Sequence, residues 1–233
     1  MSEWRELATS PLACVLVTLL GYRLGLWLRE RTGGHPLAQP VLVAIVVAAA
    51  AITLADVDYA TYADGAWLVS FWLGPATVAL AVPLHRQVRR LHGMAGPMLV
   101  AIPLGALVSM LSAYGLVTLL GGGEELALTL APKAATTPVS IALAEEAGGI
   151  PALTAVVTVL AGVLGAVAGP TVLTLARVRD RRARGLAIGA SSHGIGTSRA
   201  LHEDEVEGAF SGLSMGLTAL VTSLLMPVLV WLL

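Results

Sequence analysis

From Ile150 to Ala176 the sequence reads IPALTAVVTVLAGVLGAVAGPTVLTLA, without a charged side chain. A helix needs about 20 predominantly apolar residues to span the hydrocarbon core of a bilayer. The stretch does not alternate with the period of two that is expected of a membrane β-strand. It therefore predicts a transmembrane α-helix, and similar apolar runs recur along the chain.

The composition of the whole chain agrees with a membrane protein. Of 233 residues, 56% are hydrophobic and 12% are charged, and the mean hydropathy is +0.82. Soluble domains carry about 25% charged residues. We predict an all-α polytopic membrane protein with about six to eight transmembrane helices, some of them broken or re-entrant. The apolar runs cover residues 10–28, 37–55, 66–84, 95–120, 126–144, 150–176, 185–201 and 206–233.

Several classes of function are excluded by what the sequence lacks. A net charge of −1 gives no electrostatic reason for a nucleic-acid partner. Cys14 is the only cysteine, and the five histidines lack metal-ligand spacing. No Gly-x-x-x-x-Gly-Lys-Ser/Thr loop for ATP is present, and no carboxylate is placed to orient His193 for hydrolysis. We expect no cofactor, no metal site and no enzymatic activity.

We predict one transmembrane domain over residues 1–233, placed as a multi-pass protein in the cell (inner) membrane. Within it, residues 1–120 form an N-terminal helix group, and residues 121–233 form a C-terminal group that carries the polar motifs.

Basic loops predict the orientation in the membrane. The positive-inside rule places these loops in the cytoplasm. The N-terminus then lies outside, and run 126–144 must enter and leave on one side to keep the last basic loop in the cytoplasm. Whether run 185–201 crosses the membrane or turns back stays open, and so does the side of the C-terminus. The loops contain Arg23, Arg29 and Arg31; Arg86, Arg89 and Arg90; and Arg177, Arg179, Arg181, Arg182 and Arg184.

The run 126–144 contains the stretch APKAATTP at residues 131–138, where two prolines favour a break. Each proline lacks an amide donor and disfavours a helical residue before it. A lysine at membrane depth usually faces a cavity or a partner. Lys133 with the hydroxyls of Thr136 and Thr137 therefore predicts an anion site. The alternative is that Lys133 extends to the membrane surface.

A second polar stretch, SSHGIGTSR, covers residues 191–199. Gly194 and Gly196 permit backbone angles that other residues avoid. We expect an unwound segment here, after which Thr197 or Ser198 caps a new helix. The amides at the start of such a helix attract a carboxylate. The alternative is a polar loop on the cytoplasmic surface.

Two further features carry polar side chains. The stretch Gly74-Pro-Ala-Thr77 interrupts run 66–84, and Thr77 is its only side-chain donor. It fits a binding role and a proline kink between packed helices equally well. Glu207 belongs to an acidic stretch that opens the last run, where acids favour a helix start. We expect Glu207 to pair with Arg199.

The polar stretches at 133–138 and 192–199 resemble the LrgB/CidB family of membrane proteins, and further matches occur at 74–81, 148–155 and 205–211. The resemblance covers nearly the whole chain, although alanines at 134 and 135 and serine at 198 depart from the residues common in the family. It implies two functions. One is modulation of murein hydrolase export and autolysis together with a small holin-like LrgA/CidA membrane partner. The other is transport: plastid relatives exchange glycolate and glycerate, and bacterial pairs are linked to pyruvate uptake.

We predict a secondary transporter of small monocarboxylates such as pyruvate, glycolate, glycerate or lactate, with the autolysis modulator as the alternative. Cations and hydroxyls inside the membrane match a short carboxylate. The mechanism requires Lys133 and Arg199 to face one chamber, and His193 is a candidate for proton coupling. The expected partners are the substrate, the lipid bilayer and an LrgA/CidA-like subunit, and a homo-oligomer is left open. The predicted substrate-binding residues are Lys133, Thr136, Thr137, Ser191, Ser192, His193, Gly194, Gly196, Thr197, Ser198, Arg199 and Thr77.

Overall fold

A computed structural model describes residues 9–35, 38–79 and 94–232, except for the side chains at 73, 74 and 76–79. Within these ranges the chain is α-helical and contains no β-strand, which confirms the predicted fold class. The chain divides into two compact units, Met1–Ala76 and Thr77–Leu233. The helix predicted at 95–120 therefore belongs with the later helices.

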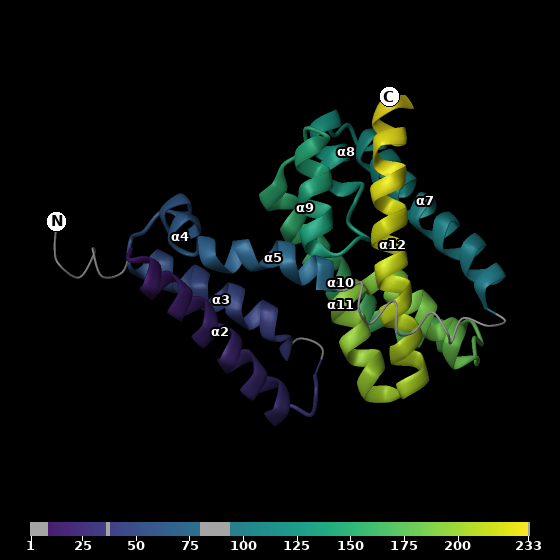
Figure 1. The fold of residues 1–233 in the computed structure, drawn as a ribbon, viewed down its shortest axis with the longest axis horizontal. Helices are drawn as coiled ribbons and strands as arrows, with labels where there is room; N and C mark the ends of the chain where they lie inside the picture. The colour runs from purple at the N-terminus through teal and green to yellow at the C-terminus, as the bar shows by residue number, and fades with distance from the viewer. Residues whose placement is uncertain (1–8, 36–37, 80–93, 233) are drawn as a thin grey trace. The chain divides into compact units, whose positions relative to one another are not determined.

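Unit 1 contains the helices α2 (Pro11–Arg31), α3 (Pro40–Leu54) and α4 (Tyr59–Gly65), and most of α5 (Trp67–Ala79). The helix α2 begins at Pro11, and the side chain of Ser10 caps it by accepting a hydrogen bond from the Ala13 amide. It packs closely on α3, since a Cβ added at Gly25 would lie 2.5 Å from the Cα of Pro40. Figure 1 shows α2 and α3 side by side, as expected from this contact.

Unit 2 repeats one arrangement twice. A long helix, α7 (Ala95–Leu119), is followed by two short helices, α8 (Glu124–Leu130) and α9 (Thr137–Glu146). A second long helix, α10 (Pro151–Leu175), is followed by α11 (Arg181–Glu203), which is itself broken, and then by α12 (Glu205–Leu232). Both long helices have 25 residues, and each precedes a broken helical hairpin.

The first hairpin consists of α8 and α9, and residues 131–136 between them are not helical. The break predicted at 131–138 is therefore confirmed. The hydroxyl of Ser140 donates to the carbonyl of Pro132 at 2.7 Å and closes the tip. After α9, the amide of Ile150 donates to the hydroxyl of Thr129, the last residue but one of α8, at 2.8 Å. The chain thus returns beside α8 before it enters α10, as a re-entrant element does.

The second hairpin is α11, which bends at His193, where φ is 39° and ψ is −134°. Its two ends lie together, because the Arg181 guanidinium is 3.8 Å from the Asp204 carboxylate and 2.9 Å from that of Glu207. The run predicted at 185–201 therefore turns back. As a result, α12 starts where α11 starts, and the C-terminus lies at the far end of α12 (Figure 1).

The two long helices of unit 2 run in opposite directions. Near the start of α7, Ile102 belongs to one hydrophobic cluster with Phe210 in the first half of α12, and further along Met110 belongs to a second cluster with Met226. These two helices are therefore parallel. The end of α10 contacts the start of α11 through the Arg184–Thr174 hydrogen bond. The starts of α7, α11 and α12 and the end of α10 thus share one end of unit 2, which we call the arginine end.

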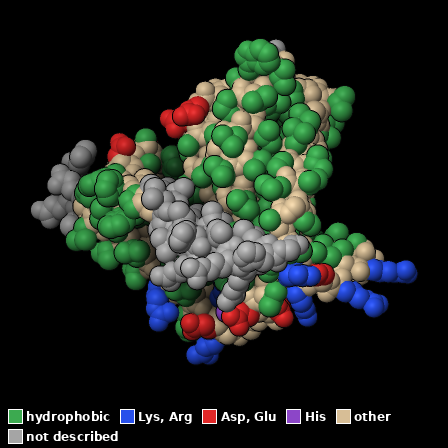
Figure 2. All heavy atoms as spheres, turned by 45° about the vertical axis from the view of Figure 1, so that its right-hand side comes forward, with side chains coloured by type: hydrophobic (Ala, Val, Ile, Leu, Met, Phe, Trp, Pro, Cys, Tyr) green, Lys and Arg blue, Asp and Glu red, His purple; other side chains and the backbone are tan. Residues whose placement is uncertain are grey.

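By length and composition, four helices in the described ranges can cross a membrane: α2, α7, α10 and α12. A fifth candidate is the pair α3 and α4, bent by 120°. The number predicted from sequence, about six to eight helices, is larger for two reasons. It included the two broken hairpins, and it included run 66–84, part of which lies outside the described residues. In Figure 2 hydrophobic side chains cover much of the visible helical surface, and the arginine side chains lie outside this hydrophobic area. This distribution agrees with helices exposed to lipid.

Candidate functional site

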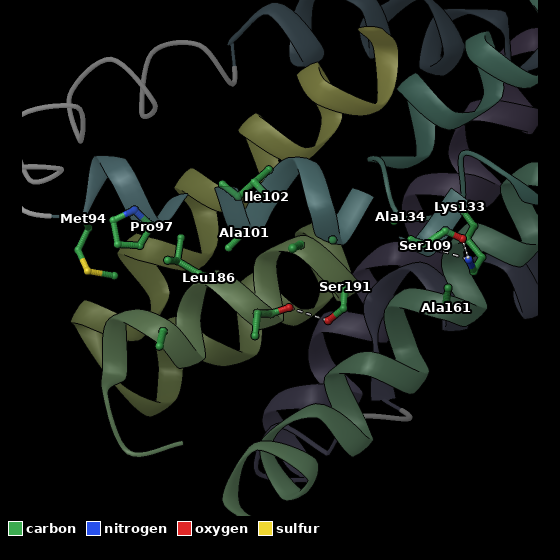
Figure 3. Close-up of a pocket in the computed structure, with 14 residues that line it drawn as sticks. Met94, Pro97, Ala101, Ile102, Ser109, Lys133, Ala134, Ala161, Leu186 and Ser191 are labelled. Atoms are coloured by element: carbon green, nitrogen blue, oxygen red, sulfur yellow. Dashed lines mark hydrogen bonds between the residues drawn. The ribbon is translucent and has the colours of Figure 1, made fainter. Parts of the chain in front are cut away.

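A cavity of about 620 Å³ lies between α7 and α11 in unit 2. Its walls are mostly apolar, with Pro97, Ile102 and Leu186 among them. It begins at the arginine end, where Met94 precedes α7, and it reaches Ser109 in the middle of α7 (Figure 3). At 1.5 Å per helical residue, the distance from Pro97 to Ser109 is about 18 Å. The cavity therefore extends well into the depth of a bilayer.

Lys133 lies at the inner end of this cavity, at the tip of the first hairpin (Figure 3). Its ammonium group donates to the carbonyl of Ser109 at 3.0 Å and to the Ser109 hydroxyl at 3.1 Å. An ammonium group has three donors, so one is left for a ligand. No carboxylate of the described residues forms an ion pair with Lys133. It is also the only lysine in the chain, which makes its ammonium group a distinct chemical marker of the site.

Ser191, near the tip of the second hairpin, lines the same cavity. Its hydroxyl donates to the carbonyl of Ala187 at 2.8 Å and lies 3.2 Å from the Ser192 hydroxyl. The hydroxyl oxygen keeps lone pairs, and its hydrogen can rotate toward a ligand. The tips of the two oppositely directed hairpins thus contribute one cation and one hydroxyl to one space.

His193 does not line the cavity and instead anchors the second hairpin to α10. Its Nε2 lies 2.9 Å from the carbonyl oxygen of Thr158. The ring covers Gly162, where an added Cβ would lie 2.3 Å from the imidazole. Ser192 beside it is fully buried against Gly165. These glycines are required because any side chain would displace the hairpin tip.

The helix cap expected at Thr197 or Ser198 is not formed, because the backbone breaks at His193 and the helix has already resumed at Gly194. The Thr197 hydroxyl donates to the carbonyl of His193 at 2.7 Å and lies 2.8 Å from the Ser211 hydroxyl. Thr197 therefore joins the second arm of the hairpin to α12. Ser198 lies on the same arm, where it is partly exposed.

The two glycines of this stretch differ in their surroundings. Gly196 is buried, and a Cβ added there would lie 2.4 Å from the Cβ of Ser192. Gly194 is exposed, and its nearest neighbour for an added Cβ is the Met215 sulfur at 3.8 Å. Close packing of the two arms therefore depends on Gly196 rather than on Gly194.

Arg199 is placed away from the cavity that contains Lys133. Its Nε donates to the Glu203 carboxylate at 2.7 Å, and its guanidinium also contacts the carbonyl of Ala166 in α10. It is not among the cavity-lining residues. The expectation that Lys133 and Arg199 face one chamber is therefore not met in this structure. The pairing expected between Arg199 and Glu207 is wrong as well, because Arg181 and Arg184 bind the Glu207 carboxylate.

The remaining predicted residues lie at helix ends. Thr136 is the N-cap residue of α9, and its buried hydroxyl has no partner among the described residues. Thr137 is the first residue of α9 and is partly buried. The Thr77 side chain lies outside the described residues. In α5 the helix continues through Pro75, so no break interrupts the described part of this run.

Sequence reasoning missed Ser109, which binds Lys133 with both its hydroxyl and its carbonyl. Its only signal was a hydroxyl within a long apolar run, and such serines are common in membrane helices. The partnership depends on contact between segments 24 residues apart, which the local pattern does not reveal.

Comparison with known proteins gives a consistent family. The chain matches the model of the LrgB-like family over residues 18–232. It is 35% identical over 218 residues to the uncharacterized protein YxaC of Bacillus subtilis, covering 94% of each chain. It is 30% identical over 218 residues to the antiholin-like protein LrgB of Bacillus mycoides, covering 94% of this chain and 95% of the relative. No solved structure matches.

Proposed function

Since the chain belongs to the LrgB-like family of membrane proteins, we propose that it is a secondary transporter that carries small monocarboxylates across the membrane. The observation that carries the proposal is the Lys133 ammonium group at the inner end of a cavity that has no carboxylate among its lining residues. A cation in such surroundings favours an anionic ligand, because the cost of removing it from water is offset only by opposite charge or hydrogen bonds.

The lining favours a short carboxylate. The carboxylate of such a ligand accepts a charge-assisted hydrogen bond from Lys133, and the Ser191 hydroxyl is a further polar group elsewhere on the cavity wall. The rest of the ligand contacts small apolar residues such as Ala134 and Ala161. Pyruvate, lactate, glycolate and glycerate have this form, with a carboxylate and a small body that carries at most two further oxygen groups.

The opposed hairpins support alternating access. Inverted repeats and broken helices that meet near the membrane centre are typical of secondary transporters. Here the two helix-and-hairpin repeats have opposite directions, and both hairpin tips line the cavity. Under the positive-inside rule the arginine end is cytoplasmic, so the cavity extends toward the cytoplasm. In this proposal the second tip is held in place by Ser192, His193, Gly196, Thr197 and Arg199.

The second candidate function is modulation of autolysis. It is favoured by the name of several relatives, antiholin-like protein LrgB. In this role the chain assembles with a small LrgA/CidA-type membrane subunit, and the Lys133 cavity has no direct part in the activity.

Transport is tested with purified protein in proteoliposomes and a panel of labelled pyruvate, lactate, glycolate and glycerate. We expect saturable uptake of at least one of them. Loss of a hydrogen bond to a charged group costs about 1.5–3 kcal/mol, so Lys133→Gln is expected to lower kcat/KM by roughly 10- to 100-fold. The control is Arg182→Gln, which removes one positive charge outside the cavity and is expected to keep uptake.

The amine of Lys133 offers a second readout, since no other side chain of the protein has an amine. A water-soluble acylating reagent is expected to modify Lys133, and a transported carboxylate is expected to slow the reaction. Undiminished uptake by Lys133→Gln would remove Lys133 from the site. Absence of uptake for the whole panel, combined with a lysis phenotype that Lys133→Gln still complements, would establish the modulator instead.

A further inference from the structure

A second cavity, of about 390 Å³, lies at the arginine end, where α10 stops and α11 starts. It shares no lining residue with the Lys133 cavity, and the proposed transport does not use it. Four of its six lining residues are arginines. They are Arg177, Arg179, Arg181 and Arg184, and the other two are Thr174 and Val178.

The floor of this arginine cavity is rigidly held. Arg184 is buried, and its Nε lies 3.4 Å from the carboxylate of Glu207, which is fully buried in α12. Its terminal nitrogens donate to the hydroxyl of Thr174 and to the carbonyls of Pro170 and Val178 at 3.3–3.4 Å. Arg184 is thus fixed by partners on three elements before any ligand arrives.

The rim carries positive charge without compensation. Arg181 pairs with Glu207 at 2.9 Å and lies 3.8 Å from Asp204, so its charge is largely balanced. Arg177 and Arg179 are exposed and form no ion pair with any residue that the structure describes. Two free guanidinium groups therefore stand beside a buried one across a single hollow.

We propose that the arginine cavity binds a phosphate group. Guanidinium forks match phosphate oxygens geometrically and bind them in pairs. The Thr174 hydroxyl on the wall donates to the Pro170 carbonyl at 2.7 Å and accepts from Arg184, so it helps to hold Arg184 in place rather than bonding the ligand itself. Basic pockets at the cytoplasmic ends of membrane helices bind phospholipid head groups, and the same chemistry accepts a soluble phosphate. The shared ligand is a phosphate group, inorganic or esterified, with at least two oxygens free to accept hydrogen bonds.

The central test compares two charge-matched double variants. In R177Q/R179Q both free guanidinium groups of the rim are lost. In R23Q/R182Q two arginines that do not line the cavity are lost. Loss of bonds to a charged group predicts that R177Q/R179Q weakens phosphate binding by at least about tenfold. The control is expected to change the affinity by less than about threefold, which is the effect of the general field.

Two arms separate the sources of phosphate. In the first, inorganic phosphate is titrated into detergent-solubilised protein at constant ionic strength, with the melting temperature as readout. In the second, native mass spectrometry counts phosphatidylglycerol and phosphatidylcholine bound to the protein. Binding in either arm that depends on Arg177 and Arg179 supports the proposal, and the arm identifies the source. Absence of binding in both arms, or equal weakening by both double variants, would overturn it.

A neutral substitution covers the case in which R177Q/R179Q fails to insert into the membrane. Thr174→Val keeps every charge that sets the orientation, but it removes the hydroxyl on the wall and one contact of Arg184. We expect it to weaken phosphate binding by about fivefold, because Arg184 loses one of the hydrogen bonds that hold it in place. Unchanged affinity of this variant would contradict the geometry on which the proposal rests.

Discussion

Replacing Glu207 with glutamine tests the ion cluster that holds the base of the second hairpin. The Glu207 side chain is 0% exposed, and the Arg184 side chain is 11% exposed. The variant keeps the size of the side chain and removes its charge, so Arg184 is left buried without a carboxylate. Removing one partner of a buried ion pair costs about 3–5 kcal/mol. The Arg181 side chain is 53% exposed, so water can solvate its charge when Glu207 is replaced. Arg181 therefore does not change the expected cost of about 3–5 kcal/mol.

The matched control is Glu203→Gln, which breaks the pair between Glu203 and Arg199. These two side chains are 34% and 31% exposed and lie four residues apart on one helix. Such a pair contributes about 0.3–0.5 kcal/mol. The two variants remove the same charge from positions four residues apart in the sequence, and the structure predicts that their costs differ by about an order of magnitude.

Thermal unfolding of the purified protein in detergent measures the difference. For a chain of this size, 1 kcal/mol shifts Tm by about 2–4 °C. Glu207→Gln is therefore expected to lower Tm by at least about 6 °C, and Glu203→Gln by less than about 2 °C. Equal shifts, or a larger shift for Glu203→Gln, would refute the assignment of Glu207 as the central carboxylate of the cluster.

Two further predictions concern the start and the packing of α11. A Cβ at Gly189 would lie 2.1 Å from the carbonyl oxygen of Ser211, so Gly189→Ala is expected to destabilise the protein by at least about 1–3 kcal/mol. A Cβ at Gly194 has no neighbour closer than 3.8 Å, so Gly194→Ala is expected to leave Tm nearly unchanged. Equal Tm values for the two variants would contradict this packing. The side-chain hydrogen bond from Arg182 lowers the pKa of Asp180 from 3.8 to about 2, so the stabilisation by this carboxylate is complete well above pH 3.8 and is lost as the pH falls toward 2. The Tm difference between the protein and Asp180→Asn should therefore stay constant from pH 8 to about pH 5 and then shrink. A difference that vanishes already at pH 6 would refute this prediction.

The first break was predictable from sequence because its cause is local. The prolines at 132 and 138 restrict the backbone wherever they occur, and the chain is not helical at 131–136. Lys133 was predictable as a cavity residue for a similar reason, since an ammonium group among apolar segments needs polar surroundings. Its partner Ser109 was not, because that contact is made only after the hairpin packs against α7.

The second break was expected near Gly194 and Gly196 because glycine permits unusual backbone angles. The chain turns one residue earlier, at His193, where contacts with α10 hold the imidazole in place. Tertiary contact thus overrides local preference. Arg199 was misplaced for a different reason. A carboxylate four residues later, Glu203, satisfies its guanidinium on the same helix face, and this spacing was already visible in the sequence.

The positive φ at His193 has a consequence for how residue 193 can vary. Glycine adopts such an angle without strain, whereas a residue with a Cβ loses about 1–3 kcal/mol there. The histidine is therefore kept in a turn that it disfavours, and its bond to the Thr158 carbonyl and its contact with Gly162 must outweigh this loss. Substitutions at position 193 therefore separate two requirements. Glycine adopts the bend without strain but loses the hydrogen bond to Thr158. Any other residue keeps the backbone strain and also loses that hydrogen bond.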